Sequence, residues 1–229
     1  MDTDFNKETT GGELDGRNTF IKKVYGHVLL AIVIFLLTEY LLFTTSFGVE
    51  LVTKLVTMNW LIVLGGFIVL GFIARHFAGG RKSLSLQYTG LILYAVINAV
   101  IFSPLLLTAA LYSDPSVIPN AAIVTLVGFS ILTAIVFFSK KDFSFLRLLI
   151  TWGGVLALIA IVLSVLTSIN LGLGFSIAMV GLAGAAVLYD TSNIRTRYPE
   201  DQYVGAAIDL FASIALMFWY VLRIFMSRD

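Results

Sequence analysis

The sequence predicts an all-α integral membrane protein, a bundle of seven transmembrane helices. Of the 229 residues, 59% are hydrophobic and only 13% are charged, whereas about a quarter of the residues of a soluble domain are charged. The charged residues gather in short clusters, and the apolar runs between them have the ~20 residues that a helix needs to cross a bilayer. Membrane barrels have short segments of alternating polarity instead, so we exclude them.

The chain is expected to divide into a polar tail and a membrane domain. Residues 1–20 mix acidic, amide, Thr and Gly residues without apolar periodicity, which is typical of a disordered and solvated cytoplasmic tail. The membrane domain then covers residues 21–229. Its first span, 24–45, is too long for the apolar core of a cleaved signal peptide. The other spans are expected at 59–77, 86–112, 120–138, 145–168, 172–194 and 203–226.

The positively charged residues predict the orientation of these spans. Of the 15 Lys and Arg residues, all but Lys54, Arg223 and Arg228 fall on one side of the membrane when the seven spans alternate. Because cytoplasmic loops are enriched in Lys and Arg, we expect the N-terminus in the cytoplasm and the C-terminus outside. No predicted loop is large enough for a soluble catalytic domain, so any activity must reside in the bundle.

Three acidic residues lie within the predicted spans: Glu39, Asp190 and Asp209. An ionisable side chain inside a bilayer is costly, and it is by default a functional-site hypothesis. Asp190 and Asp209 lie near the inner ends of the sixth and seventh spans. Consecutive antiparallel helices joined by a short loop are usually neighbours, so we expect the two carboxyl groups to meet.

Two carboxyl groups in one apolar pocket would form a pH-controlled latch. They share a proton, and they repel each other once that proton is lost. The alternative is that Asp190 caps or solvates a helix end and Asp209 hydrogen-bonds a neighbouring helix. Asp190 and Asp209 could also make transient contacts with Ca²⁺, which prefers oxygen ligands.

Four polar residues other than the two aspartates are also considered: Glu39, Asn98, Arg75 and His76. Glu39 either extends towards the outer headgroups or begins a polar path that passes Asn98 on the third span and reaches Asp209. Arg75 and His76, at the inner end of the second span, are expected to anchor that span at the interface. Their alternative role is to counter the charge of the inner acidic residues.

The composition excludes several classes of function. The chain has no cysteine, which excludes disulfides and thiol chemistry. Its net charge of +1, without a basic stripe, argues against a nucleic-acid partner. We expect no cofactor and no stable metal centre. Intramembrane hydrolases with paired aspartates carry a Gly-x-Gly-Asp type of motif, which neither aspartate has here, so we expect that the protein is not an enzyme.

Several strings resemble the Bax inhibitor-1 family, also called TMBIM. These are L-Y-D-T-S-N-I at 188–194, Y-V-G-A-A-I-D-L-F at 203–211, V-L-R-I-F at 221–225 and F-I-K-K-V-Y at 20–25. The first string is most similar to the bacterial YccA branch, and the likeness covers residues 20–229. The resemblance implies six helices around a central C-terminal helix, in the inner membrane of a bacterium.

The resemblance also implies a function. Members of the family include pH-sensitive calcium leak channels that are gated by two aspartates on the last two helices. Asp190 matches the first aspartate, but the second falls at Ser213. Asp209 lies four residues earlier on the same helical face, so the latch is either re-formed one turn lower or lost.

Two functions therefore follow from the resemblance. The first is a pH-sensitive leak channel in the lipid bilayer, with Ca²⁺ or protons as the permeant ions. The second comes from the YccA branch: a regulator that binds and restrains a membrane-anchored AAA-type protease.

Overall fold

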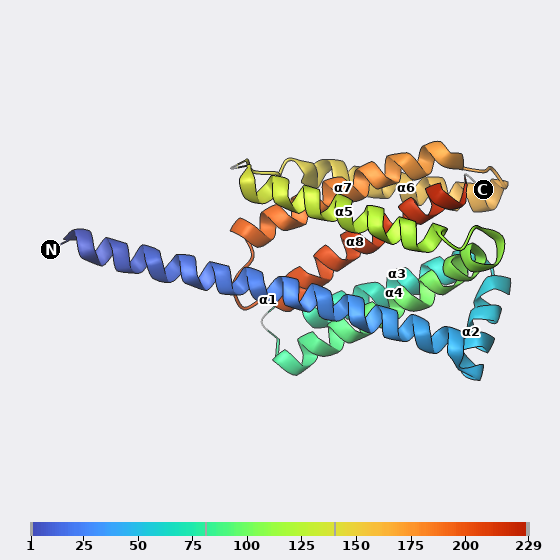
Figure 1. Ribbon diagram of the computed structural model, residues 1–229, viewed down its shortest axis with the longest axis horizontal. Helices are drawn as coiled ribbons and strands as arrows, with labels where there is room; N and C mark the ends of the chain where they lie inside the picture. Colours follow the sequence, from blue (N-terminus) through green and yellow to red (C-terminus); the bar gives the residue numbers. More distant parts are fainter. Residues whose placement is uncertain (1, 81, 140, 228–229) are drawn as a thin grey trace.

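The structure is a bundle of α-helices (Figure 1). It is a computed structural model that describes residues 2–80, 82–139 and 141–227, with side chains described from residue 15 onward. Within these ranges the chain forms helices and no strand. The helices are α1 (Asp2–Thr44), α2 (Ser46–Thr57), α3 (Trp60–Ala78), α4 (Leu84–Tyr112), α5 (Val117–Phe138), α6 (Leu146–Thr167), α7 (Gly172–Thr196) and α8 (Tyr203–Met226).

Seven of the helices in the described part of the chain are long and apolar enough to cross a membrane, which confirms the predicted number. All of them except α1 agree with the predicted spans to within three residues at each end. Their outward faces carry large exposed apolar side chains, such as Leu36, Phe72 and Leu156. A surface of this kind suits lipid rather than water.

Helix α1 continues without a break through the predicted tail boundary at residue 20. Phe20 is only 1% exposed, and it packs in the same apolar cluster as Val24 on α1 and Ala207 and Leu210 on α8. Phe20, the last residue of the predicted tail, therefore packs with the bundle. The division into a tail and a membrane domain stays a prediction.

Between the first two spans lies α2, a short helix that was not predicted. The Thr45 side chain accepts a hydrogen bond from the Gly48 backbone N–H at 3.1 Å and so caps the helix. Gly48 is required there, because a Cβ would lie 2.5 Å from the Leu42 backbone. With 12 residues, α2 is too short to span a bilayer.

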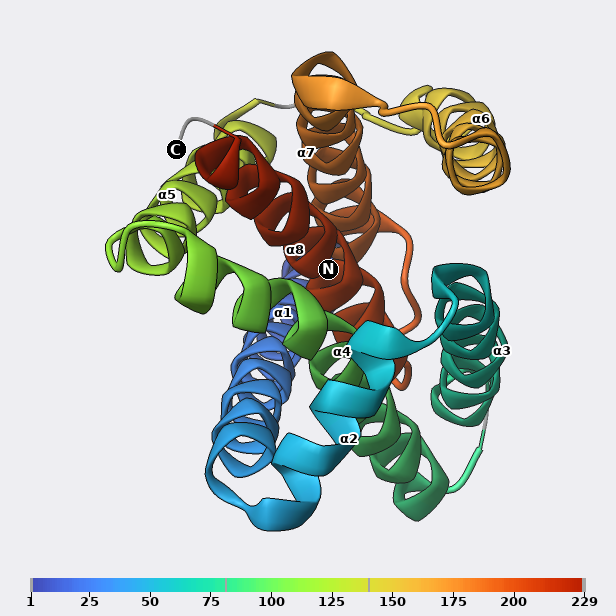
Figure 2. The same ribbon diagram turned by 90° about the vertical axis from the view of Figure 1, so that its right-hand side faces the viewer.

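Helix α8 lies at the centre of the bundle (Figure 2). It packs against α1, α3, α4, α5 and α7. In its most apolar stretch 67% of the residues are buried, compared with 6% in α6. Helix α6 packs chiefly on α7, and its Ala157 joins Met179 of α7 and Tyr220 of α8 in a small apolar cluster. The helix nearest the C-terminus is thus central, as predicted.

Helices α3 and α4 approach each other closely at Gly90. A Cβ at Gly90 would lie 2.6 Å from the Ala74 carbonyl oxygen and 2.7 Å from the Ala78 nitrogen. Because only glycine leaves room for that backbone, the two helices meet along the last turns of α3. This contact places Arg75, which follows Ala74, beside the body of α4.

Candidate functional site

The candidate site lies at the end of the bundle where α1 emerges, on the left in Figure 1. The α3–α4, α5–α6 and α7–α8 connections share this end. Most of the Lys and Arg residues of the chain belong to the start of α1, to these connections or to the helix ends beside them. We therefore call this end of the bundle the basic end. Both aspartates of the last two helices lie near it.

Asp190 is held by a hydroxyl group of α8. The Ser213 Oγ donates a hydrogen bond to the Asp190 Oδ2 at 2.5 Å. Ser213 is 7% exposed, so this bond lies inside the bundle. It joins α7 to α8 directly. A hydrogen bond to an ionised carboxylate is shorter and stronger than one between neutral groups.

Asp209 has different partners. The Arg75 Nη1 on α3 donates to the Asp209 Oδ1 at 2.8 Å, which makes an ion pair. The Tyr198 hydroxyl, in the α7–α8 connection, donates to the Asp209 Oδ2 at 2.5 Å. Asp209 therefore fastens both α3 and the connection to α8.

Arg75 is itself fixed by α4. Its Nη2 donates to the Tyr94 hydroxyl oxygen at 3.0 Å, and its guanidinium carbon lies 5.1 Å from the centre of the Tyr94 ring. The planar guanidinium can make both contacts at once because its donors form a rigid fork. Arg75 thus bridges α4 and α8 from its place on α3.

The Tyr198 hydroxyl remains a donor across the physiological pH range. Burial raises its pKa, and the charges of Asp209 and Asp190 and the hydrogen bond to Asp209 raise it further, while Arg75 acts in the opposite direction. A tyrosine with a raised pKa keeps its proton below the ordinary value of about 10 and loses it only at higher pH. Any response of the site between pH 5 and 8 must therefore come from other groups.

A pocket opens between these elements at the basic end, and it encloses about 220 Å³. Arg75, Tyr198 and Asp209 line it together with Gln202 and with small or apolar residues near the end of α3 and the start of α8. Gly205 faces α3 in this pocket, where a Cβ would lie 3.3 Å from the Ala78 carbonyl oxygen. The pocket gives small molecules and ions access to the ion pair from the basic end.

The amino-acid sequence matches a known protein family. The family described as "Inhibitor of apoptosis-promoting Bax1" matches residues 17–229. The chain belongs to the Bax inhibitor-1 family.

Similar members come from bacteria and plants. An uncharacterised protein of Pseudomonas aeruginosa is 34% identical over 172 residues, which cover 73% of this chain and 74% of that protein. The protein LIFEGUARD 4 of Arabidopsis thaliana is 33% identical over 52% of this chain and 50% of its own length. An uncharacterised membrane protein of Vibrio cholerae is 31% identical over 51% of this chain and 52% of its own.

In this Bax inhibitor-1 protein the two aspartates share one electrostatic cluster without bonding each other. Asp190 lies within range of the charges of Asp209 and Arg75, but Ser213 and not Asp209 is its hydrogen-bond partner. The reason is the position of Ser213 and Asp209 along the axis of α8. Ser213 reaches Asp190, while Asp209, one turn closer to the basic end, reaches Arg75 and Tyr198.

Arg75 and His76 separate in role. The prediction favoured interfacial anchoring for both, but Arg75 takes the alternative role of counter-charge to Asp209. His76 has an exposed side chain. The helical period separates the two residues, because consecutive positions point in directions about 100° apart.

The predicted polar path is not joined by hydrogen bonds in the described residues. Asn98 is buried and donates to the Tyr94 carbonyl oxygen at 2.8 Å, within its own helix. Glu39 is 7% exposed, so it is enclosed rather than extended to the headgroups, and neither carboxylate oxygen has a hydrogen-bond partner in the structure. Glu39 lies four residues after the buried Phe35 on α1 and therefore shares its inward face.

No group of three or more acidic, His or Cys side chains that could hold a metal ion occurs among the described residues. A bound Ca²⁺ takes six to eight oxygen ligands. The Asp190 and Asp209 carboxylates are too few for a stable site of that kind. Transient contact with a passing cation stays a prediction.

Two functional residues were not identified from the sequence: Tyr198 and Tyr94. Tyr198 lies in a connection, directly before Pro199, and Tyr94 lies in an apolar span in which aromatic residues are common. The position of Tyr198 between the two acidic helices was the one available signal. Nothing in the local pattern around Tyr94 distinguishes it from a residue that packs in the core.

Proposed function

We propose that this Bax inhibitor-1 protein is a passive leak channel for cations, with Ca²⁺ the expected ion, and that protonation of its acidic cluster opens it. The observation that carries the proposal is the pair of contacts between helices at the basic end. Asp190 accepts from Ser213 and so joins α7 to α8, and Asp209 pairs with Arg75 and so joins α3 to α8. Both contacts end on acidic groups.

The direction of the pH response follows from the charge of the acidic cluster. Hydrogen bonds to an ionised carboxylate are the stronger ones, and both contacts between helices end on carboxyl groups, so adding a proton to the cluster weakens the hold of α7 and α3 on α8. Tyr198 does not interfere, since its hydroxyl keeps its proton over this range. Acid is therefore expected to loosen α3 and widen the pocket beside it.

The ion selectivity follows from the sign of the charges. Ionisable groups facing the interior of a membrane bundle mark ion pathways, and acidic side chains favour cations in channels. Glu39 supports the same path nearer the other end of the bundle, because it is enclosed and its oxygens have no hydrogen-bond partner in the structure. We place the basic end in the cytoplasm, in a bacterial inner membrane.

The test is Ca²⁺ influx into proteoliposomes between pH 8 and pH 5.5. We expect the wild-type flux to rise about tenfold as the pH falls, the effect of losing one interaction of ~1.4 kcal/mol. The double variant Asp190→Asn/Asp209→Asn should show a flux that no longer depends on pH. Glu50→Gln is the matched control, because Glu50 is exposed and pairs with Lys54 on α2. Wild-type flux no greater than that of empty liposomes would contradict the proposal, as would equal pH profiles for wild type and the double variant.

A second candidate is the regulation of a membrane-anchored AAA-type protease at the basic end. The observation that favours it is the N-terminal part of α1, which projects beyond the other helices (Figure 1). Deleting residues 2–14 removes this projection but keeps Arg17 and Phe20. If the projection is the protease contact, the purified protease should bind the full chain at least tenfold more tightly than the shortened one. Equal binding would contradict this second candidate and leave the leak channel as the proposed function.

A further inference from the structure

The start of α1 docks on the α7–α8 connection through Arg17. Its Nε donates to the Arg195 carbonyl oxygen at 2.7 Å, and its Nη1 donates to the Tyr198 carbonyl oxygen at 2.6 Å. Its Nη2 donates to the Asn193 carbonyl oxygen at 3.3 Å. One side chain near the start of the chain thus contacts three backbone carbonyls that lie 176 to 181 residues later.

These carbonyls mark the end of α7. The Asn193 oxygen already accepts the backbone N–H groups of Arg197 and Tyr198, at 2.8 and 3.0 Å, which closes the last turn. The final carbonyls of a helix lack partners within the helix and carry partial negative charge. A guanidinium is suited to this place because it bears a positive charge and several donors in one plane.

Arg17 is also held from its own helix. Its guanidinium carbon lies 4.8 Å from the centre of the Phe20 ring, and Phe20 is almost fully buried. A cation placed over an aromatic ring in this way is attracted by the ring. The guanidinium therefore lies between a buried ring of α1 and the end of α7, in a defined position.

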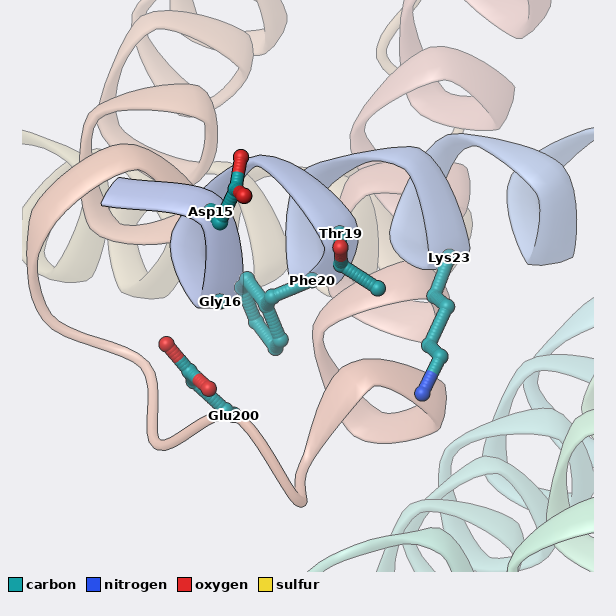
Figure 3. Close-up of a pocket in the computed structure, with 6 residues that line it drawn as sticks. All are labelled: Asp15, Gly16, Thr19, Phe20, Lys23 and Glu200. Atoms are coloured by element: carbon teal, nitrogen blue, oxygen red, sulfur yellow. The ribbon is translucent and has the colours of Figure 1, made fainter. Parts of the chain in front are cut away.

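A second pocket lies beside this contact, between α1 and the α7–α8 connection (Figure 3). It encloses about 410 Å³ and shares Phe20 with the contact. On its far side Glu200 approaches α1 so closely that a Cβ on Gly16 would lie 2.9 Å from both carboxylate oxygens. The lining residues are Asp15, Gly16, Thr19, Phe20, Lys23 and Glu200.

Tyr198 connects Arg17 to the acidic cluster. Its carbonyl oxygen accepts from Arg17, and its hydroxyl donates to Asp209. A shift of the connection away from α1 would carry the Tyr198 ring with it and remove one of the two side chains that bond Asp209. The charged groups that face Tyr198 are Asp209, Asp190 and Arg75, and Glu200 is the charged group beside Arg17.

We propose that Arg17 is a positioning residue of the leak: it holds the α7–α8 connection on α1 so that the Tyr198 hydroxyl stays on Asp209. The inference rests on the proposed function. It adds that the start of α1 sets how readily the acidic cluster opens. A displacement of the N-terminal segment would then be transmitted to Asp209 through the side chains of Arg17 and Tyr198.

The experiment compares Arg17→Ala, Arg17→Lys and Lys22→Ala with the wild type, in nanodiscs and in proteoliposomes. Lys22→Ala is the matched control, because it removes the same charge from an exposed face of the same helix. Amide hydrogen exchange over residues 196–203 reports on the connection, where the Tyr198 and Gln202 N–H groups are hydrogen-bonded. Ca²⁺ flux against pH reports on the cluster.

We expect Arg17→Ala to speed exchange in this segment about tenfold and to raise the flux at pH 7 several-fold, shifting the flux profile so that less acid opens the leak. Arg17→Lys keeps the positive charge but loses the planar arrangement of several donors. Its exchange and flux should lie between those of Arg17→Ala and the wild type. Lys22→Ala should match the wild type. In the Tyr198→Phe background, Arg17→Ala should add little to the flux, because both act through one hydroxyl.

The outcomes separate this inference from the proposed function. Normal exchange in Arg17→Ala means that the contact does not hold the connection, and faster exchange with an unchanged flux profile means that Arg17 is structural only. Additive effects of Arg17→Ala and Tyr198→Phe on the flux would show that Arg17 does not act through the Tyr198 hydroxyl. Each of these overturns the positioning role while leaving a wild-type leak. Absence of wild-type flux overturns both proposals.

Discussion

Replacing Arg75 with alanine is expected to raise the Ca²⁺ leak about five- to tenfold at pH 7. The change removes the ion pair to Asp209 and the hydrogen bond to Tyr94, which together hold α3 on α4 and α8. The Arg75 and Asp209 side chains are 44% and 34% exposed. We therefore assign the pair at most ~1 kcal/mol, the upper end of the range for exposed pairs, and the remainder of the effect to the hydrogen bond with Tyr94.

A double-mutant cycle tests whether the effect comes from this pair. Asp209→Asn and Arg75→Ala should each raise the leak at pH 7, and the double variant should leak little more than either one. His76→Ala is the control, because the exposed His76 lies next to Arg75 at the same helix end. Two independent, multiplying effects would show that Arg75 and Asp209 act on different steps.

Replacing Ser213 with aspartate is expected to change the direction of the pH response. Ser213 bonds Asp190 at 2.5 Å, so the introduced carboxyl would lie in contact with the carboxyl of Asp190. The two share a proton in acid and repel when both ionise. At a separation of ~4 Å this repulsion is of the order of 2–4 kcal/mol near a protein surface. The leak should then increase at least tenfold between pH 6 and pH 8.5.

The same proteoliposome assay measures this reversal, with two control variants. Ser213→Asn places a neutral side chain of the same size as aspartate at this position. Ser213→Ala removes the hydrogen bond to Asp190 without adding charge. Both should raise the leak modestly and keep the wild-type direction. If Ser213→Asp behaves like Ser213→Asn at every pH, the two carboxyl groups do not interact, and Asp190 has no part in the pH response.

The sequence was sufficient to predict the fold because the physics of spanning a bilayer is simple. A spanning helix needs a long apolar run, and each of the seven runs is separated from the next by charged or polar residues. Helix α2 was missed because this criterion does not detect a short helix with a buried face. The packing of Phe20 and the docking of Arg17 could not be predicted, because their partners on α8 and in the α7–α8 connection are distant in the sequence.

The candidate site could be predicted only in part, for a related reason. The cost of an acid in a span identified Asp190 and Asp209 without knowledge of the fold. Their partners could not be found in this way, since Arg75, Tyr198 and Ser213 lie on three different segments. Whether Asp190 contacts Asp209 or Ser213 depends on how α8 is rotated and shifted along its axis relative to α7, and a shift of one turn exchanges the two. The helical period of the sequence does not determine this rotation or this shift.

The central place of α8 has a consequence for biosynthesis. The ribosome completes α1–α7 before it makes the helix on which most of them pack. Because membrane helices insert singly before they associate, the earlier spans wait in lipid with the faces that pack on α8 uncovered, the Asp190 and Arg75 groups that bond Ser213 and Asp209 of α8 included. Translation of residues 203–226 is therefore the event that lets the protein assemble, and a chain arrested earlier would present these polar groups to the bilayer.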